Sequence, residues 1–253
     1  MDGIGRYFAK VWDGGDFVLF GPDHLVFIIF FLLFNLSFIW LRRIESERFR
    51  RNMRWGMAFA SIIVEVAWHS WKIWLGEWTV AEMLPLHLCS IFVILNSIML
   101  FTRSYRVYEF SYFLGIGGAL QAFLTPDAGV YGLWHFRPIQ TLLAHGLIIS
   151  EAVYMTVVEG YRPTVKSFLH VLVYGNVAMA VVYVINLLVG GNYMFLMHKP
   201  ATASLLDVLG PWPWYILSLE AVGFVMFGVL YLPWAIIDWR KKRRMSTAAV
   251  ATG

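Results

Sequence analysis

The chain has 253 residues, of which 59% are hydrophobic and only 14% are charged, and its formal net charge is +4. Soluble domains carry about 25% charged residues, so this composition excludes a water-soluble globular protein and predicts one membrane domain surrounded by lipid. The basic residues lie at the ends of apolar segments, which argues against nucleic-acid binding, and the single cysteine, Cys89, excludes an intrachain disulfide bond.

The first 23 residues precede any long apolar run. Five apolar side chains recur there at helical spacing: Ile4, Tyr7, Phe8, Val11 and Trp12. This pattern is compatible with a short helix on the outer membrane surface. A flexible segment fits the same residues, so both interpretations of residues 1–23 stay open.

Seven apolar runs follow, each long enough to cross about 30 Å of hydrocarbon at about 1.5 Å per residue. We therefore predict an all-α membrane protein with transmembrane helices at 24–41, 53–74, 84–101, 107–124, 139–158, 168–189 and 214–237. The membrane domain covers residues 24–240. Residues 241–253 form a basic cytoplasmic tail, with its last eight residues expected to be disordered.

The connections between these helices alternate in charge. Those after the first, third, fifth and seventh helices are rich in arginine and lysine, whereas the others contain only Lys72, Arg137 and Lys199. Because basic loops remain on the cytoplasmic side, we expect a multi-pass protein of the plasma membrane with its N-terminus outside and its C-terminus in the cytoplasm.

Several polar side chains fall at a similar depth once this orientation is assumed. They lie in the outer half of six helices: Glu65, His69, His87, Cys89, Gln121, His145, Asn186 and Glu220. Polar groups in hydrocarbon tend to face the interior of a helix bundle or a wet cavity. We therefore predict one polar cavity open to the outside, with the outer loop 190–213 above it and Tyr193, Lys199 and Asp207 as further binding residues.

Structural interpretations of the same residues stay open. His69 fits interfacial packing as well as a site role, and Glu220 fits a simple ion pair. Gln121 and Asn186 are typical of interhelical hydrogen bonds, worth about 1 kcal/mol each. A lone cysteine in a membrane helix is usually a small packing residue. The glycines at 115, 117 and 118 lie inside a predicted helix and indicate close helix packing.

Three stretches resemble a known family. They are the segment Leu86-His87-Leu88-Cys89, the segment HFRPIQTLLAH that ends at His145, and the outer loop NYMFLMHKP with LLDVLGPWPWY. They are similar to the YwaF-like bacterial membrane proteins, which are related to the animal transmembrane protein 164 family. The resemblance covers most of the chain and implies a bacterial plasma membrane. It also implies a six-helix barrel formed by helices two to seven, with helix one outside it.

The resemblance implies acyl transfer between phospholipids through an acyl-cysteine, with Cys89 as the nucleophile and His145 as its partner. The partners would then be membrane lipids, and neither a cofactor nor a metal is required. Because backbone N–H groups are bonded within helices, we expect side chains to stabilise the oxyanion, with His69, Gln121 and Asn186 as candidates.

Two other functions fit the residues. A metal-dependent lipid hydrolase would draw its ligands from Glu65, His69, His87 and His145, with Glu65 and His69 one helical turn apart. A transporter or receptor without enzymatic activity would use the polar layer as its ligand site, although the sequence contains no inverted repeat.

Overall fold

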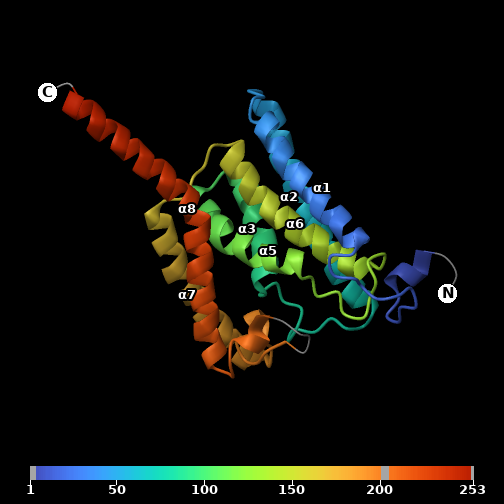
Figure 1. Cartoon of the computed structure of the whole chain (residues 1–253). Coiled ribbons are helices and arrows are strands. Elements are labelled where there is room, and N and C mark those ends of the chain that lie inside the picture. The colour runs from blue at the N-terminus through green and yellow to red at the C-terminus, as the bar shows by residue number, and fades with distance from the viewer. Residues whose placement is uncertain (1–3, 201–204, 252–253) are drawn as a thin grey trace.

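The computed structural model describes residues 4–200 and 205–251, which form helices and loops without a β-strand. The short helix η1 (Ile4–Phe8) precedes α1 (Pro22–Leu41), α2 (Glu47–Trp74) and α3 (Leu88–Thr102). The segments α4 (Tyr105–Phe110), η2 (Ser111–Gly115) and α5 (Ile116–Leu124) follow one another without a break. Next come α6 (Phe136–Val157), α7 (Val165–Val189), the short helices η3 (Tyr193–Phe195) and η4 (Leu205–Val208), and α8 (Trp214–Ala251) (Figure 1).

The prediction of seven long helical segments in this order is confirmed within the described residues, with differences at the ends. The third helix begins at Leu88 rather than at residue 84, because Pro85 lacks a backbone N–H and His87 has the extended conformation of an N-cap. The expected disorder of the C-terminal residues was wrong up to Ala251, since α8 continues through the basic segment. Residues 252–253 lie outside the described part.

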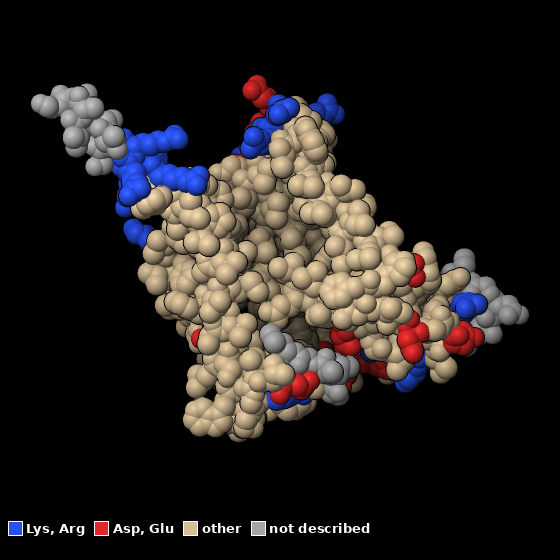
Figure 2. All heavy atoms as spheres, in the orientation of Figure 1, with Lys and Arg blue, Asp and Glu red and all other residues tan. Residues whose placement is uncertain are grey.

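Among the described residues, three helices are long and apolar enough to cross a membrane by length and composition: Pro22–Leu41, Val165–Val189 and Trp214–Met245. Helix α3 is apolar but shorter, with 15 residues. Figure 2 shows that charged side chains gather toward opposite ends of the molecule, with a wide band of other residues between them. This distribution is typical of a protein whose middle is surrounded by hydrocarbon.

Helix α6 lies at the centre of the packing. It contacts α1, α2, α3 and α5, and about half of its residues are buried. The largest hydrophobic cluster surrounds its inner half and includes Tyr108, Phe113, Tyr154 and Met155. Helix α7 contacts α4, while α8 contacts α5 and α7 at the side of the molecule (Figure 1). In a simple ring of helices each helix contacts two others, whereas α6 contacts four. The six-helix barrel therefore stays a prediction.

Glycines allow close approach of the helices at two places near the site. A Cβ atom added at Gly118 in α5 would lie 2.8 Å from Leu88 Cδ2 in α3, and one at Gly146 in α6 would lie 2.4 Å from Phe31 Cζ in α1. Carbon atoms pack best at about 3.5–4.0 Å. The helices can therefore adopt this spacing because these side chains are absent, as predicted for Gly118.

Residues 4–15, the N-terminal strap, are held against the C-terminal end of α2 and the N-terminal end of α6. The backbone oxygens of the strap accept hydrogen bonds from Trp71 Nε1 (2.8 Å to Phe8), His135 Nε2 (3.0 Å to Ala9) and the Tyr131 hydroxyl (3.1 Å to Lys10). Lys10 also forms an ion pair of 2.6 Å with Glu77. Only Ile4–Phe8 is helical, so the segment is an ordered strap rather than a long surface helix.

Candidate functional site

Cys89 is the second residue of α3, and its position at a helix start changes one expectation. Helix N-termini leave backbone N–H groups without intrahelical acceptors, and the side chain of the N-cap residue His87 does not cap this turn. The expectation that all backbone N–H groups here are bonded within helices was therefore wrong. The first turn of α3 offers backbone donors beside the sulfur, together with the positive end of the helix dipole.

The thiol is half-buried among apolar side chains of three helices. Cys89 packs against a cluster formed by Phe92, Val93, Ala119 and Ile148. These apolar side chains keep part of the surrounding water away from the sulfur.

His145 lies on α6 with one ring nitrogen fixed. Its Nδ1 is 2.6 Å from the backbone oxygen of Thr141, and a carbonyl oxygen can only accept, so Nδ1 carries the hydrogen and Nε2 stays available as a base. Helices α3 and α6 pack against each other, and Ile148, about one turn after His145, belongs to the cluster around Cys89. The fold thus brings the segments that carry the two residues together.

Glu65 and His69 form a second pair on α2. Their Oε1 and Nε2 atoms are 3.5 Å apart, and Trp78 Nε1 donates a hydrogen bond of 3.0 Å to His69 Nδ1. This pair could orient one proton, but a metal site needs further ligands. Across residues 4–200 and 205–251, no group of three His, Cys, Asp or Glu side chains could hold a metal ion.

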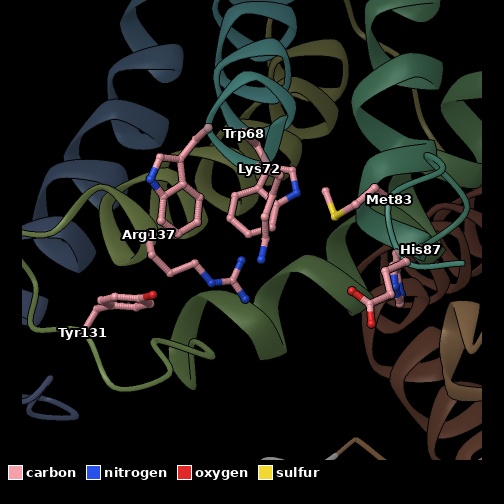
Figure 3. A pocket seen from close by; sticks show the side chains of 8 residues that line it. Trp68, Lys72, Met83, His87, Tyr131 and Arg137 are labelled. Carbon is pink, nitrogen blue, oxygen red and sulfur yellow. The ribbon is translucent and has the colours of Figure 1, made fainter. Parts of the chain in front are cut away.

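A cavity of about 310 Å³ opens at the C-terminal end of α2 and the N-terminal ends of α3 and α6. Its lining is aromatic and charged: Trp68, Trp71, Lys72, Glu82, Met83, His87, Tyr131 and Arg137 (Figure 3). Of the residues that the sequence indicated for a cavity, His87 alone belongs to this lining. His87 also packs against the rings of Tyr193 and Phe195, with centroid distances of 5.2 and 5.5 Å.

Other residues of the predicted layer hold the outer loop in place. The amide group of buried Asn186 donates to the Tyr193 oxygen at 3.0 Å and accepts from the Tyr193 nitrogen at 2.8 Å. The Tyr193 hydroxyl accepts from Leu84 N at 2.8 Å and donates to the Val80 oxygen at 2.5 Å. These contacts join the 190–213 loop to the connection between α2 and α3, which is a structural role.

The last predicted residues make separate contacts. Glu220 of α8 accepts a hydrogen bond of 3.2 Å from Asn176 of α7. Lys199 donates to the backbone oxygen of exposed Asp207 at 3.4 Å. Gln121 is half-buried on α5. A common depth therefore does not make these side chains part of one cavity.

A buried polar network around Glu151, in the C-terminal half of α6, was not predicted from the sequence. The Glu151 carboxyl group accepts from Ser61 Oγ of α2 at 2.6 Å and from Asn96 Nδ2 of α3 at 2.9 Å. Ser111 of the π-helical segment η2 donates to Asn96 Oδ1 at 2.5 Å. One acidic residue within the apolar run 139–158 was the available signal, since such residues are costly in hydrocarbon.

Comparison with protein families identifies one family that matches this chain. The family model described as the TMEM164 family matches residues 19–231, which is most of the chain. The expected relation to the transmembrane protein 164 family is thereby confirmed. No curated protein and no solved structure matches the chain.

Proposed function

Because the chain belongs to the TMEM164 family, we propose that it is a membrane-embedded lipid acyltransferase or acyl hydrolase that uses Cys89 and His145. The proposal includes seven membrane spans in a bacterial plasma membrane, with the N-terminus outside. The charge distribution supports this orientation, since basic residues gather at the end of α8 and beside the end of α1 (Figure 2).

The observation that carries the proposal is the position of Cys89 in the first turn of α3. A helix N-terminus favours the thiolate form of a cysteine, whereas the apolar surroundings of Cys89 oppose it, so a base is needed to accept the proton. The same helix end supplies backbone N–H groups that can stabilise an oxyanion. His145 on the adjacent helix α6 has its Nδ1 hydrogen bonded to Thr141. Its Nε2 atom is therefore available to accept a proton, as a general base requires.

The chemistry proceeds in two balanced steps. His145 takes the proton of the Cys89 thiol, the sulfur attacks an ester carbonyl of a phospholipid, and the carbon–oxygen bond of the ester breaks. The protonated imidazole returns its proton to the departing lysolipid oxygen, which leaves an acyl-cysteine. A second hydroxyl group, from a lysolipid or from water, then attacks the thioester. Its proton passes through His145 to the released sulfur.

An acyl adduct provides the test. Purified protein is incubated with a phospholipid that carries an alkyne on its acyl chain, and the labelled peptide is identified by mass spectrometry. Since Cys89 is the single cysteine of the chain, the site of a thioester is unambiguous. We expect the adduct in the wild-type protein and its loss in Cys89→Ala.

Histidine variants separate catalysis from folding. His145→Ala should form the adduct about 10²–10⁴ times more slowly, the usual contribution of a general base. His170→Ala is the matched control, because His170 lies on α7 and contacts Glu109 at 3.4 Å instead. The double variant of Cys89 and His145 should be no worse than Cys89→Ala, because residues that act as a unit are not additive. Full lipid turnover by Cys89→Ala, abolished by a chelator, would disprove the proposal.

A further inference from the structure

The cavity at the outer end of the helices has a composition that the acyl-transfer chemistry does not explain. Lys72 of α2 and Arg137 of α6 both lie against the indole ring of Trp68, with charged groups 5.4 and 4.4 Å from a ring centroid. Figure 3 shows both side chains extending into the same space. Two positive charges are thus held side by side in a partly buried place.

Their acidic partners neutralise them from outside the cavity. Lys72 Nζ is 2.7 Å from Glu77, and Arg137 Nη2 is 3.3 Å from Asp127. Neither of these acids lines the cavity, and the one acidic residue that does, Glu82, is exposed. An anion placed between Lys72 and Arg137 inside the cavity would accept charge-assisted hydrogen bonds from both.

We infer that this cavity binds the phosphate group of a glycerophospholipid, with Lys72 and Arg137 as its two cationic ligands. The inference rests on the proposed function and specifies where its substrate is held. The tryptophan and tyrosine rings of the lining are typical of the depth of lipid headgroups. His87 adds a further polar group to the lining, two residues before Cys89.

The geometry of α6 connects this cavity to the proposed catalytic pair. Arg137, Thr141 and His145 are spaced four residues apart and therefore share one face of the helix. Arg137 and His145 are eight residues apart, which corresponds to about 12 Å along the helix axis. A phosphate held at the outer end leaves the glycerol and its acyl esters to extend along this face toward His145.

Lipid binding without turnover tests the inference. The full chain carrying Cys89→Ala is purified in detergent, and bound lipid is measured by native mass spectrometry. The probes are dioctanoyl phosphatidylglycerol, dioctanoylglycerol, which lacks the phosphate, and inorganic phosphate as a competitor. We expect the phospholipid to bind at least about tenfold more tightly than the diglyceride, the effect of one or two charge-assisted hydrogen bonds.

Charge-removing variants identify the ligands. Lys72→Gln/Arg137→Gln should lower phospholipid affinity at least about tenfold, to the level of the diglyceride. The matched control is Arg42→Gln/Arg43→Gln, which removes two positive charges from exposed residues after α1 that do not line the cavity and should leave affinity unchanged. Should the first pair fail to fold, Lys72→Gln keeps the contacts of Arg137 with Trp68 and Asp127, and a severalfold loss is expected.

Three results would overturn the inference. Unchanged phospholipid affinity in the variants of Lys72 and Arg137 would show that these residues do not bind the lipid. Equally tight binding of the diglyceride would show that the phosphate group is not recognised. Competition by inorganic phosphate at the concentration of the lipid would identify a site for the free anion instead. Because the binding measurements use Cys89→Ala throughout, failure of the wild-type protein to form the acyl adduct in the preceding test would refute the chemistry but not the headgroup site.

Discussion

Gly146 provides a sharp test of the packing around the site, because it lies next to His145 where α6 meets α1. A Cβ atom in Gly146→Ala would lie 2.4, 2.5 and 2.6 Å from three carbons of the Phe31 ring. These distances must grow by about 1 Å or more to reach ordinary carbon contacts. The Phe31 ring packs edge-on against the Phe123 ring, with 5.4 Å between the ring centroids, and this contact restricts its movement. Overpacking of this kind costs about 1–3 kcal/mol.

The magnitude follows from a comparison with a second glycine. Alanine stabilises a helix by about 1 kcal/mol relative to glycine, which offsets part of the overpacking cost. For Gly56 of α2, no atom of the described residues lies within 4 Å of the added Cβ, so Gly56→Ala keeps the whole gain. The free energies of unfolding of the two variants should therefore differ by about 1–3 kcal/mol.

Thermal unfolding of the purified variants in detergent measures this difference. About 2–4 °C per kcal/mol is expected for a chain of this size. Combining Phe31→Leu with Gly146→Ala should cost less than the sum of the two single changes, because the smaller side chain removes the clash. A Gly146→Ala protein at least as stable as Gly56→Ala would refute the packing argument.

Four further expectations follow from the structure. Glu151→Leu removes the carboxyl group that accepts from Ser61 and Asn96 and should lower the free energy of unfolding by about 1–3 kcal/mol. Ser70→Ala, on the exposed face of α2, should leave the free energy of unfolding unchanged. The hydrogen bonds and charges of Lys10 and Lys72 lower the pKa of Glu77 from 4.5 to about 2. Protection of the N-terminal strap from hydrogen exchange should therefore be complete above pH 4.5 and should be lost as the pH falls toward 2. Glu77→Gln should remove that pH dependence. A reporter fused after Arg244 should be active in the cytoplasm, and periplasmic activity would reverse the orientation. Asn186→Leu should lower the free energy of unfolding by about 1–3 kcal/mol and should have little effect on adduct formation per folded molecule. Normal stability with reduced adduct formation would instead indicate that Asn186 acts in the site.

Hydropathy was sufficient to predict the order and approximate limits of the helices. Long apolar runs identify them because lipid contact and burial both favour apolar side chains. The ends depend on local detail that hydropathy does not record. Pro85 delays the start of α3 to Leu88, and the charged residues after Trp239 continue α8 instead of ending it.

The direction in which each side chain points around its helix was harder to predict from the sequence. Counting residues from a helix end gives depth, but packing decides which neighbour a side chain meets. Asn186 and His87 have similar predicted depths, yet Asn186 bonds to the backbone of Tyr193 while His87 lines the cavity. Lys72 and Arg137 were counted as loop charges, and only the fold shows that both lie against Trp68.

The length of α3 links these observations. Its 15 residues span about 22 Å, less than the roughly 30 Å of a hydrocarbon core. If its inner end reaches the inner boundary, its N-terminal turn lies below the outer boundary. Irregular backbone at such a depth is tolerated where protein surrounds it or a cavity lies beside it, and here His87 lines one. The short helix would thus place Cys89 and unpaired N–H groups deeper than the Lys72–Arg137 pair, as the ester of a phospholipid lies deeper than its phosphate.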